Sequence, residues 1–494
     1  PLGRTKRFGY DAAGRLISHD RATGQRLEWV YDADGLLYQV IADGQIAATH
    51  HHDVAAGTLV VEDATDPDQP VTHRLRWDLS GRLIEQTRSD HATGTDRITS
   101  WGYDSLGRCV VVTAPSGDVT RFVYDLLGCC VEVVGVGGRV VQGFDAAGCL
   151  VSSWGPGGRQ WWEYAGGEVV RHVVEVDGEC RETVVERDGQ GRIAGIVEGG
   201  WRVEYVHDAA GQLVEARSPE GRRRWVYDAG GRLVAEERDD ALIRYVYDAA
   251  GQLLEQHRDG GGVTRFSYDA AGRRISQDGP HGRTEYRWSA LGWLTSITQP
   301  SGVTSVHVNA LSELARVDDV EVFWGSPSSV LEVGGVSVTP IPGMVAVGER
   351  WGVTGWREQR YSDPAAPWTP SSGVGLDGIG VGAGGCLFFA GMEWLGYRVQ
   401  DPNTRGFLSR DPLVPVVGAA WVGNPYAYAG NDPLHALDPQ GLRPVTDAEV
   451  QQYIQQNHSS RLNWKTFVGV AVTIVGIAVT PVCPIAGGAI AGAG

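Results

Sequence analysis

The chain has 494 residues and a formal net charge of −17, with 43 Lys and Arg against 60 Asp and Glu. This acidic balance argues against nucleic acid as a partner of the protein, because such binding needs a net cationic face. The 42% hydrophobic content excludes wholesale disorder. The high counts of glycine (69), tryptophan (17) and tyrosine (17) favour many short strands joined by tight turns. No two of the seven cysteines have C-x-x-C spacing, so we expect neither a zinc site nor a disulfide framework.

One motif, aromatic-x-Tyr-Asp-x-x-Gly-Arg/Gln-Leu-apolar, recurs from Phe8 onward. No signal peptide precedes it, and we expect the chain to be part of a longer protein. Clean copies are 21 residues apart from Asp11 to Asp32, and 20, 20 and 21 residues apart from Asp208 to Asp269. Counting degenerate copies, the motif occurs fifteen times, at Asp11, Asp32, Asp53, Asp78, Asp104, Asp125, Asp145, Tyr164, Asp188, Asp208, Asp228, Asp248, Asp269, Ser289 and Asn309.

Each copy of the motif predicts one β-hairpin. The alternating aromatic and tyrosine have the periodicity of a strand, the aspartate starts a turn, and the glycine allows a positive φ. Stacked hairpins bury one continuous face, and about thirty strands at ~4.8 Å make a ribbon of about 140 Å that must curl. We expect an all-β shell that curls into a hollow coil wide enough to hold a protein. A β-propeller and a calcium-binding β-roll are less favoured alternatives, because their repeat lengths and signatures differ.

Over residues 8–320 the motif resembles the YD repeat of bacterial Rhs proteins, of the C components of ABC-type insecticidal toxins and of teneurins. The resemblance implies a hollow β-cocoon that encloses a toxic C-terminal region. It further implies a bacterial effector of the polymorphic-toxin type that is used in interbacterial competition. Such an effector is made in the cytoplasm and is secreted or delivered with the help of a secretion-system or delivery protein.

Four regions are expected along the chain. Residues 1–320 form the YD-repeat shell, and residues 321–395 combine degenerate repeats with loops rich in Gly, Ser and Pro. Residues 396–442 carry the densest motif, and residues 443–494 form the first part of the enclosed toxin region, called the cargo below.

The dense motif holds four Asp-Pro pairs, beginning at Asp401, Asp411, Asp432 and Asp438. Proline disfavours helix in the residue before it, so each aspartate is expected in an extended or turn conformation. On spacing alone, four simple turns are the favoured interpretation.

A resemblance adds a second interpretation. The run from Asn424 through Tyr426, Tyr428, Asn431 and Pro433 to Asp438-Pro439-Gln440-Gly441-Leu442 is similar to the end of the Rhs-associated core, which acts as an aspartyl self-protease. The resemblance implies catalytic residues Asp411 and Asp438, and a cut between Leu442 and Arg443. Two close carboxylates would share one proton, so that one activates water while the other donates to the peptide carbonyl. Arg410 is a candidate for orienting Asp411, or else a solvated surface arginine.

The last 28 residues, 467–494, carry no charged side chain. They are expected either to pack inside the cocoon or to contact a membrane, although the first apolar run is short for a membrane span. The leading hypothesis is a shell that encapsulates a C-terminal toxin and releases it by self-cleavage in cis, once per chain, with no cofactor and no metal. The alternatives are a non-enzymatic adhesion or carbohydrate-binding surface protein and a membrane-active toxin fragment.

Overall fold

The computed structural model describes residues 2–238, 241–326, 329–353, 374–376, 378–382, 386–412, 423–438, 440–442 and 445–446. Residues 467–494, which are expected to pack inside the cocoon or to contact a membrane, lie outside these residues, and so does Arg443, which follows the predicted cut. Within the described part of the chain, no helix is both long enough and apolar enough to cross a membrane.

Thirty-five strands form one antiparallel sheet, in which each strand pairs with the next along the chain. The first part of the shell contains β1 (Arg7–Tyr10), β2 (Leu16–Asp20), β3 (Arg26–Tyr31), β4 (Leu37–Ala42), β5 (Gln45–Asp53), β6 (Thr58–Asp63), β7 (Val71–Trp77), β8 (Leu83–Asp90), β9 (Thr95–Tyr103), β10 (Cys109–Thr113), β11 (Val119–Tyr124), β12 (Cys130–Gly135), β13 (Gly138–Phe144), β14 (Leu150–Gly155), β15 (Gly158–Ala165), β16 (Glu168–Val176) and β17 (Glu179–Arg187). The sheet continues with β18 (Ile193–Glu198), β19 (Trp201–His207), β20 (Leu213–Ser218), β21 (Gly221–Tyr227), β22 (Leu233–Arg238), β23 (Ala241–Tyr247), β24 (Leu253–Arg258), β25 (Gly262–Tyr268), β26 (Arg274–Gly279), β27 (Gly282–Trp288), β28 (Leu294–Gln299), β29 (Gly302–Val308), β30 (Leu314–Val317), β31 (Val320–Ser326), β32 (Ser329–Val333), β33 (Val336–Ile341), β34 (Met344–Val347) and β35 (Arg350–Val353).

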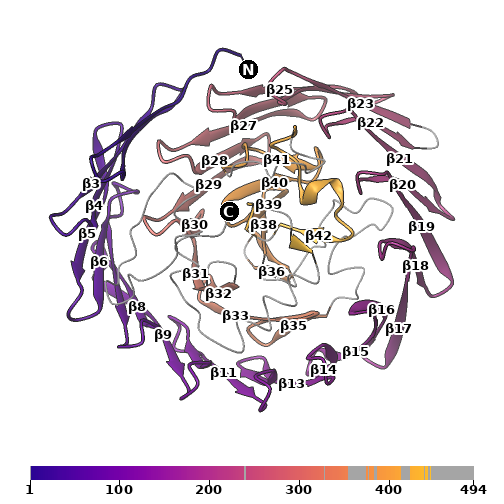
Figure 1. Ribbon diagram of the computed structural model, residues 1–494, viewed down its shortest axis with the longest axis horizontal. Helices are drawn as coiled ribbons and strands as arrows, with labels where there is room; N and C mark the ends of the chain where they lie inside the picture. The colour runs from indigo at the N-terminus through magenta and orange to yellow at the C-terminus, as the bar shows by residue number, and fades with distance from the viewer. Residues whose placement is uncertain are drawn as a thin grey trace.

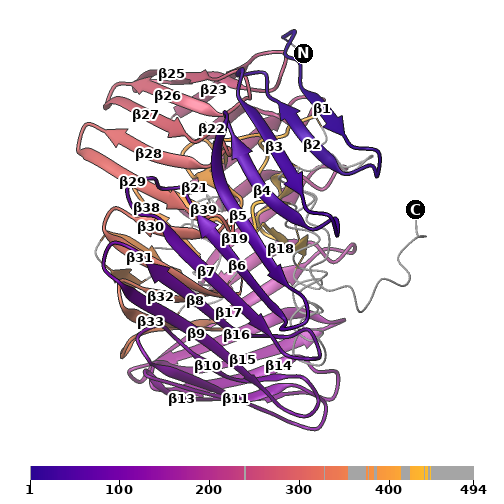
Figure 2. The ribbon, with the colours of Figure 1, turned by 90° about the vertical axis from the view of Figure 1, so that its left-hand side faces the viewer.

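The expected all-β cocoon is confirmed. The strands follow one another around a ring, and the later strands β29–β35 continue inside the arc formed by the earlier ones (Figure 1). Seen from the side, the ring is a spiral whose tilted strands form a tall wall (Figure 2).

The turn chemistry of the repeat explains why the hairpins form. In the first copy the Asp11 carboxylate accepts hydrogen bonds from the backbone N–H groups of Ala13 and Arg15, both at 2.9 Å. Its second oxygen accepts the Arg15 Nε–H at 2.7 Å. Gly14 has a φ of +78° and donates its N–H to the Asp11 carbonyl at 3.0 Å. A left-handed residue costs an L-amino acid about 1–2 kcal/mol, so glycine is favoured at this position.

In several copies the tyrosine and arginine of the motif join one hairpin to the preceding one. The Tyr31 hydroxyl donates to the Leu16 carbonyl of the preceding hairpin at 3.0 Å, and Tyr103 bonds Leu83 in the same way at 2.7 Å. The Arg15 guanidinium lies 4.6 Å from the centre of the Tyr31 ring. Asp, Arg and Tyr therefore form one bonded unit that spans two repeats.

The inner strands of the spiral are held against the outer ones by polar contacts between distant parts of the chain. The Trp101 indole N–H donates to the Gly325 carbonyl at 3.2 Å, and the Trp351 indole N–H donates to the Gly137 carbonyl at 2.9 Å. Near the start of the shell, Arg21 donates to the Leu291 carbonyl at 2.9 Å. These contacts close the seam where the spiral overlaps itself.

The C-terminal segment, defined here as the described residues between 374 and 442, lies within the ring (Figure 1). It begins with a second sheet, which consists of β36 (Val374–Leu376), β37 (Ile379–Val381), β38 (Leu387–Phe389), β39 (Met392–Leu395), β40 (Arg398–Asp401) and β41 (Gly406–Phe407). The 3-10 turn η1 (Ala429–Asn431) and the strand β42 (Ala436–Leu437) follow. β42 pairs with β43 (Val445–Thr446), which lies beyond the segment. Leu395, Phe407 and Leu434 share one apolar core with strands β17–β25 of the shell. The segment thus packs on the inner side of the wall.

Two identical turns offer a test of how the C-terminal segment is attached. Asp11–Arg15 and Asp269–Arg273 have the same sequence, but a Cβ atom at Gly14 would meet nothing within 4 Å, whereas one at Gly272 would lie 2.8 Å from both Arg410 Cδ and Tyr426 Oη. Both glycines have a positive φ, so Gly14→Ala measures backbone strain alone. We expect Gly272→Ala to lower the thermal unfolding midpoint by several degrees more than Gly14→Ala. Equal shifts would contradict the close contact.

Candidate active site

The two aspartates predicted to be catalytic meet at one arginine. Arg398, the first residue of β40, places its Nη2 atom 3.1 Å from Asp411 Oδ2 and 3.0 Å from Asp438 Oδ2. The two carboxylate oxygens are therefore at most 6.1 Å apart, the sum of these distances. The Asp438 and Arg398 side chains are almost fully buried, whereas that of Asp411 is 26% exposed. The sequence did not single out Arg398, because nothing local marks it as different from other arginines of the strands.

Arg398 also holds the backbone on both sides of the site. Its Nε–H donates to the Gly441 carbonyl, one residue before Leu442, and its Nη1 donates to the Pro425 carbonyl at 3.4 Å. The guanidinium stacks 3.6 Å from the centre of the Phe407 ring on β41. Burial lowers the pKa of Arg398, and the charges of Asp438 and Asp411 oppose that effect. The arginine is thus positioned by a ring, two carbonyls and two carboxylates.

The backbone before the predicted cut is fixed by Asp438. The Leu442 N–H donates to Asp438 Oδ1 at 2.7 Å, and the Gly441 N–H donates to the Asp438 carbonyl at 3.0 Å. Gly441 has a φ of +65°, and a Cβ atom there would lie 2.5 Å from the Leu395 carbonyl oxygen. The close approach therefore requires glycine. The antiparallel pairing of β42 with β43 joins Leu437 to Val445, and Asp438, Gly441 and Leu442 lie between these two strands in the sequence.

The other residues of the motif attach the C-terminal segment to the shell. Arg274 of β26 donates to Asp401 Oδ2 at 2.6 Å, and both side chains are buried. Arg405 donates its Nε–H to Glu236 on β22 at 3.0 Å. Arg410 lies against Gly272 in a turn of the shell, and its role in orienting Asp411 stays a prediction. Asp401 is thus a structural residue, in line with the turn interpretation of its Asp-Pro pair.

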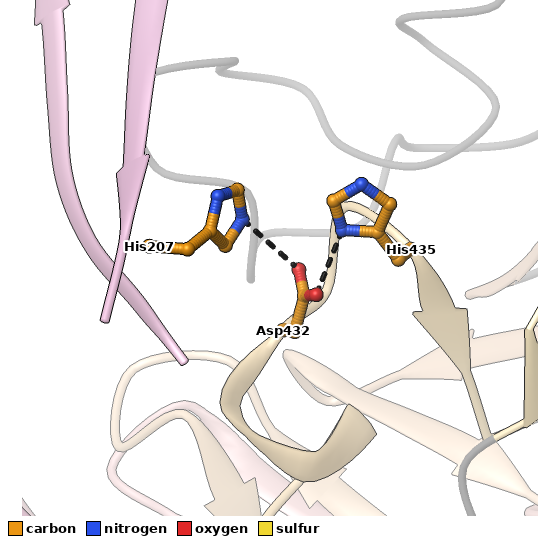
Figure 3. A group of neighbouring side chains, drawn as sticks. All are labelled: His207, Asp432 and His435. Atoms are coloured by element: carbon orange, nitrogen blue, oxygen red, sulfur yellow. Dashed lines mark hydrogen bonds and ion pairs between the residues drawn. The ribbon is translucent and has the colours of Figure 1, made fainter. Parts of the chain in front are cut away.

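A third attachment is a group of His207, Asp432 and His435 (Figure 3). Asp432 Oδ1 lies 3.6 Å from Nε2 of His207, the last residue of β19, and Asp432 Oδ2 lies 2.7 Å from His435 Nδ1. These side chains have the donor types of a metal site. However, the Ile193 N–H donates to His435 Nε2 at 2.5 Å, so the ring proton sits on Nδ1 and is donated to Asp432. Both nitrogens of His435 are then in use, and the group fits a hydrogen-bonded latch between segment and shell better than a metal centre.

The latch predicts an acid-sensitive contribution to stability. Burial raises the pKa of Asp432, but the neighbouring His207 and the hydrogen bond from His435 outweigh this and lower it to about 2. A carboxyl whose pKa is lower in the folded state stabilises the fold above its unfolded pKa of ~4, and this stabilisation is lost as the pH falls toward 2. We expect Asp432→Asn to lower the unfolding midpoint at pH 6 and to make little difference near pH 2. The measurement is the difference in midpoint between parent and variant across this range; a difference that does not change with pH would contradict the latch.

The comparisons with known proteins address the shell. The family model described as RHS Repeat matches residues 77–119, 207–241 and 247–284, which fall on hairpins of the shell. The chain carries RHS repeats. Double-stranded DNA deaminase toxin A of Burkholderia cenocepacia is 31% identical to the RHS-repeat chain over 139 residues, which are 24% of this chain and 9% of that protein.

Solved structures share the fold of the RHS-repeat chain. The crystal structure of TcdB2-TccC3-TEV matches it with a TM-score of 0.57 and 14% identity, over 88% of this chain and 27% of that one. The crystal structure of TcdB2-TccC3-Cdc42 matches with a TM-score of 0.51 and 14% identity, over 92% of this chain and 28% of that one. The RHS-repeat chain thus spans about a quarter of the length of these structures, and the likeness establishes the β-cocoon fold.

Proposed function

We propose that the RHS-repeat shell encloses the residues that follow Leu442 and separates them from the shell by aspartyl self-cleavage between Leu442 and Arg443. The observation that carries this proposal is the convergence of Asp411, Asp438 and the Gly441 carbonyl on Arg398. Two carboxylates beside a fixed peptide are the groups that water-mediated peptide hydrolysis needs. Arg443 itself lies outside the described residues.

The geometry favours cleavage within the same chain. Leu442 is only 3% exposed, so the residue before the proposed cut is shielded from a protease in solution. The hydrogen bond from Leu442 to Asp438 holds the peptide against the site without a separate binding step. We assign Asp411, the more exposed aspartate, to the activation of water, and Asp438 to the donation of a proton to the Leu442 carbonyl.

Cleavage after Leu442 would free the cargo from the wall. After the cut, the link from β43 to β42 that the described residues show would be a two-residue ladder, Ala436 with Thr446 and Leu437 with Val445. Such a ladder is weak by itself. The product would remain inside the shell until the shell opens, as expected for a toxin delivered out of the bacterium that makes it. The cargo region of the chain is therefore the proposed partner of the shell, together with a delivery protein.

Intact-mass measurement of the purified chain tests the proposal. We expect two masses, which correspond to residues 1–442 and to a fragment that begins at Arg443, and co-elution of both on size exclusion under native conditions. N-terminal sequencing of the smaller fragment should begin at Arg443. One uncut mass, or a cut at another bond, would sink the proposed function.

A further inference from the structure

Glu393 is a buried carboxyl near the candidate active site that the proposed mechanism leaves unused. It lies on β39 and is only 6% exposed. The strand register pairs Glu393 with Gln400 and Leu395 with Arg398 across β39 and β40. Directly paired residues and residues two apart on one strand share a face of a sheet. Glu393 and Arg398 therefore lie on the same face, which is also the face that meets Asp438.

Gln400, the cross-strand neighbour of Glu393, carries an unusual amide. It is fully buried, and within the described residues neither its Nε2 nor its Oε1 has a hydrogen-bond partner. A buried amide without partners costs about 1–3 kcal/mol, so such a group calls for an explanation. Its N–H donors are available to stabilise a carboxylate on Glu393 whenever that carboxyl loses its proton.

The contacts with Arg398 bear on how the two aspartates hold a proton. Arg398 bridges Asp411 and Asp438, and protonation of either aspartate would remove one half of that double ion pair. The ion pairs therefore favour the ionised form of each aspartate, whereas acid–base hydrolysis needs one carboxylate and one carboxylic acid. The proton shared by Asp411 and Asp438 stays a prediction, and a neutral carboxyl beside the pair would supply the acid from another group.

We infer that Glu393 stores the proton that Asp438 uses in self-cleavage. This inference rests on the proposed function. Burial, opposed by a hydrogen bond with Cys386 and reinforced by the charge of Asp438, raises the pKa of Glu393 to about 8, which keeps its carboxyl neutral at pH 7. The titratable or charged groups that face it are Cys386 beside β38, Arg398 on β40, and Asp438 with Asp411 beyond it. Glu393 acts through Asp438 and is a positioning residue.

The proton inventory balances. Glu393 passes its proton to Asp438, and the Gln400 amide stabilises the Glu393 carboxylate. Asp411 removes a proton from water as the water oxygen bonds to the Leu442 carbonyl carbon, while Asp438 protonates the carbonyl oxygen. The C–N bond then breaks, the proton on Asp411 moves to the Arg443 nitrogen, and the proton of the former carbonyl oxygen returns through Asp438 to Glu393. The net reaction consumes one water and leaves all three carboxyl groups as they began.

The test measures how the cleavage rate depends on pH. The full chain is produced with a photocaged aspartate at position 411, whose side chain is exposed enough for the added group, and light starts the reaction in folded protein. We expect the rate of the parent to hold up to about pH 8 and to fall above it. Glu393→Gln should cleave about 100-fold more slowly at pH 7 and regain rate at lower pH, where Asp438 takes a proton from solvent.

Matched variants separate a proton store from a structural role. Glu332→Gln removes another buried carboxyl, which accepts the Ser116 N–H at 2.8 Å, and should keep the parent profile. Glu393→Asp should cleave, with its upper limb shifted to lower pH because aspartate is the stronger acid. An unchanged profile in Glu393→Gln, or a loss by the same factor at every pH, would overturn the inference. If Glu393→Gln does not fold, as judged by near-UV circular dichroism, the test is the pH at which the cleavage rate of Glu393→Asp falls. A fall at the same pH as in the parent would then overturn the inference. No cut in the uncaged parent would instead refute the proposed function.

Discussion

Asp438→Asn is expected to leave one uncut chain where the parent gives two fragments. The substitution keeps an oxygen that can accept the Leu442 N–H, now at 2.7 Å from Asp438 Oδ1, but it removes the ability to take up and donate a proton. It also removes the charge that pairs with Arg398 at 3.0 Å. The loss of a catalytic acid–base group lowers rates by factors of ~10²–10⁴, which turns a reaction during expression into one that is not observed over hours. Intact mass spectrometry gives the answer directly.

The matched control is Asp432→Asn, which changes another Asp-Pro aspartate six residues earlier in the same segment. Asp432 contacts His207 and His435 and has no contact with Arg398 among those described. Its variant should be less stable than the parent but still cut. Complete cleavage in Asp438→Asn would show that the dyad is assigned to the wrong residues. Loss of cleavage in both variants would indicate that any weakening of the C-terminal segment is enough to stop cleavage, whichever aspartate is changed.

Arg398→Met is expected to abolish cleavage and to destabilise the protein. The substitution leaves two carboxylates without their cation, one of them at the fully buried Asp438, and it frees the Gly441 carbonyl. Removing one partner of a buried ion pair costs about 3–5 kcal/mol. Arg398→Lys should preserve more of the stability, because it retains the charge, but should still cut slowly, because an ammonium group lacks the fork that reaches both aspartates and the carbonyl.

An exposed arginine of the shell provides the control for Arg398. Arg139 pairs with Glu132 on the outside of the wall, where ion pairs contribute little. Arg139→Met should therefore leave both the unfolding midpoint and the cleavage unchanged. The measurement combines thermal unfolding followed by tryptophan fluorescence with the mass assay. A fully cleaved, equally stable Arg398→Met protein would show that the bridge is incidental.

The wall of the shell was predictable because its chemistry is local and repeated. The aspartate and the glycine of each turn lie within four residues of the groups that they bond, so one copy such as Asp11–Arg15 predicts the others. The hydroxyl bond from Tyr31 to Leu16 was not predictable in the same way. The period of the motif gives the pairing of the strands but not which polar group crosses between successive hairpins.

The site was predictable only in part. The Asp-Pro pattern pointed to Asp411 and Asp438, yet Arg398 is 40 residues from Asp438 and meets it only because the chain folds back inside the ring. Arg405 is a similar case. Its φ of +60° is unusual for a residue with a side chain, and it directs the guanidinium to Glu236, 169 residues earlier. Contacts of this range depend on the curvature of the whole spiral, and no local pattern records that curvature.

The bonds that tie Tyr31 to Leu16, and Tyr103 to Leu83, reach only the neighbouring hairpin. A wall built from such short-range ties has no preferred length, so duplication or loss of one gene segment of about twenty codons would add or remove a hairpin without redesigning the rest. Because enclosed volume grows faster than wall area, a few duplications would enlarge the container much more than they lengthen the protein. The repeat therefore gives evolution a simple way to fit one container to cargoes of different sizes.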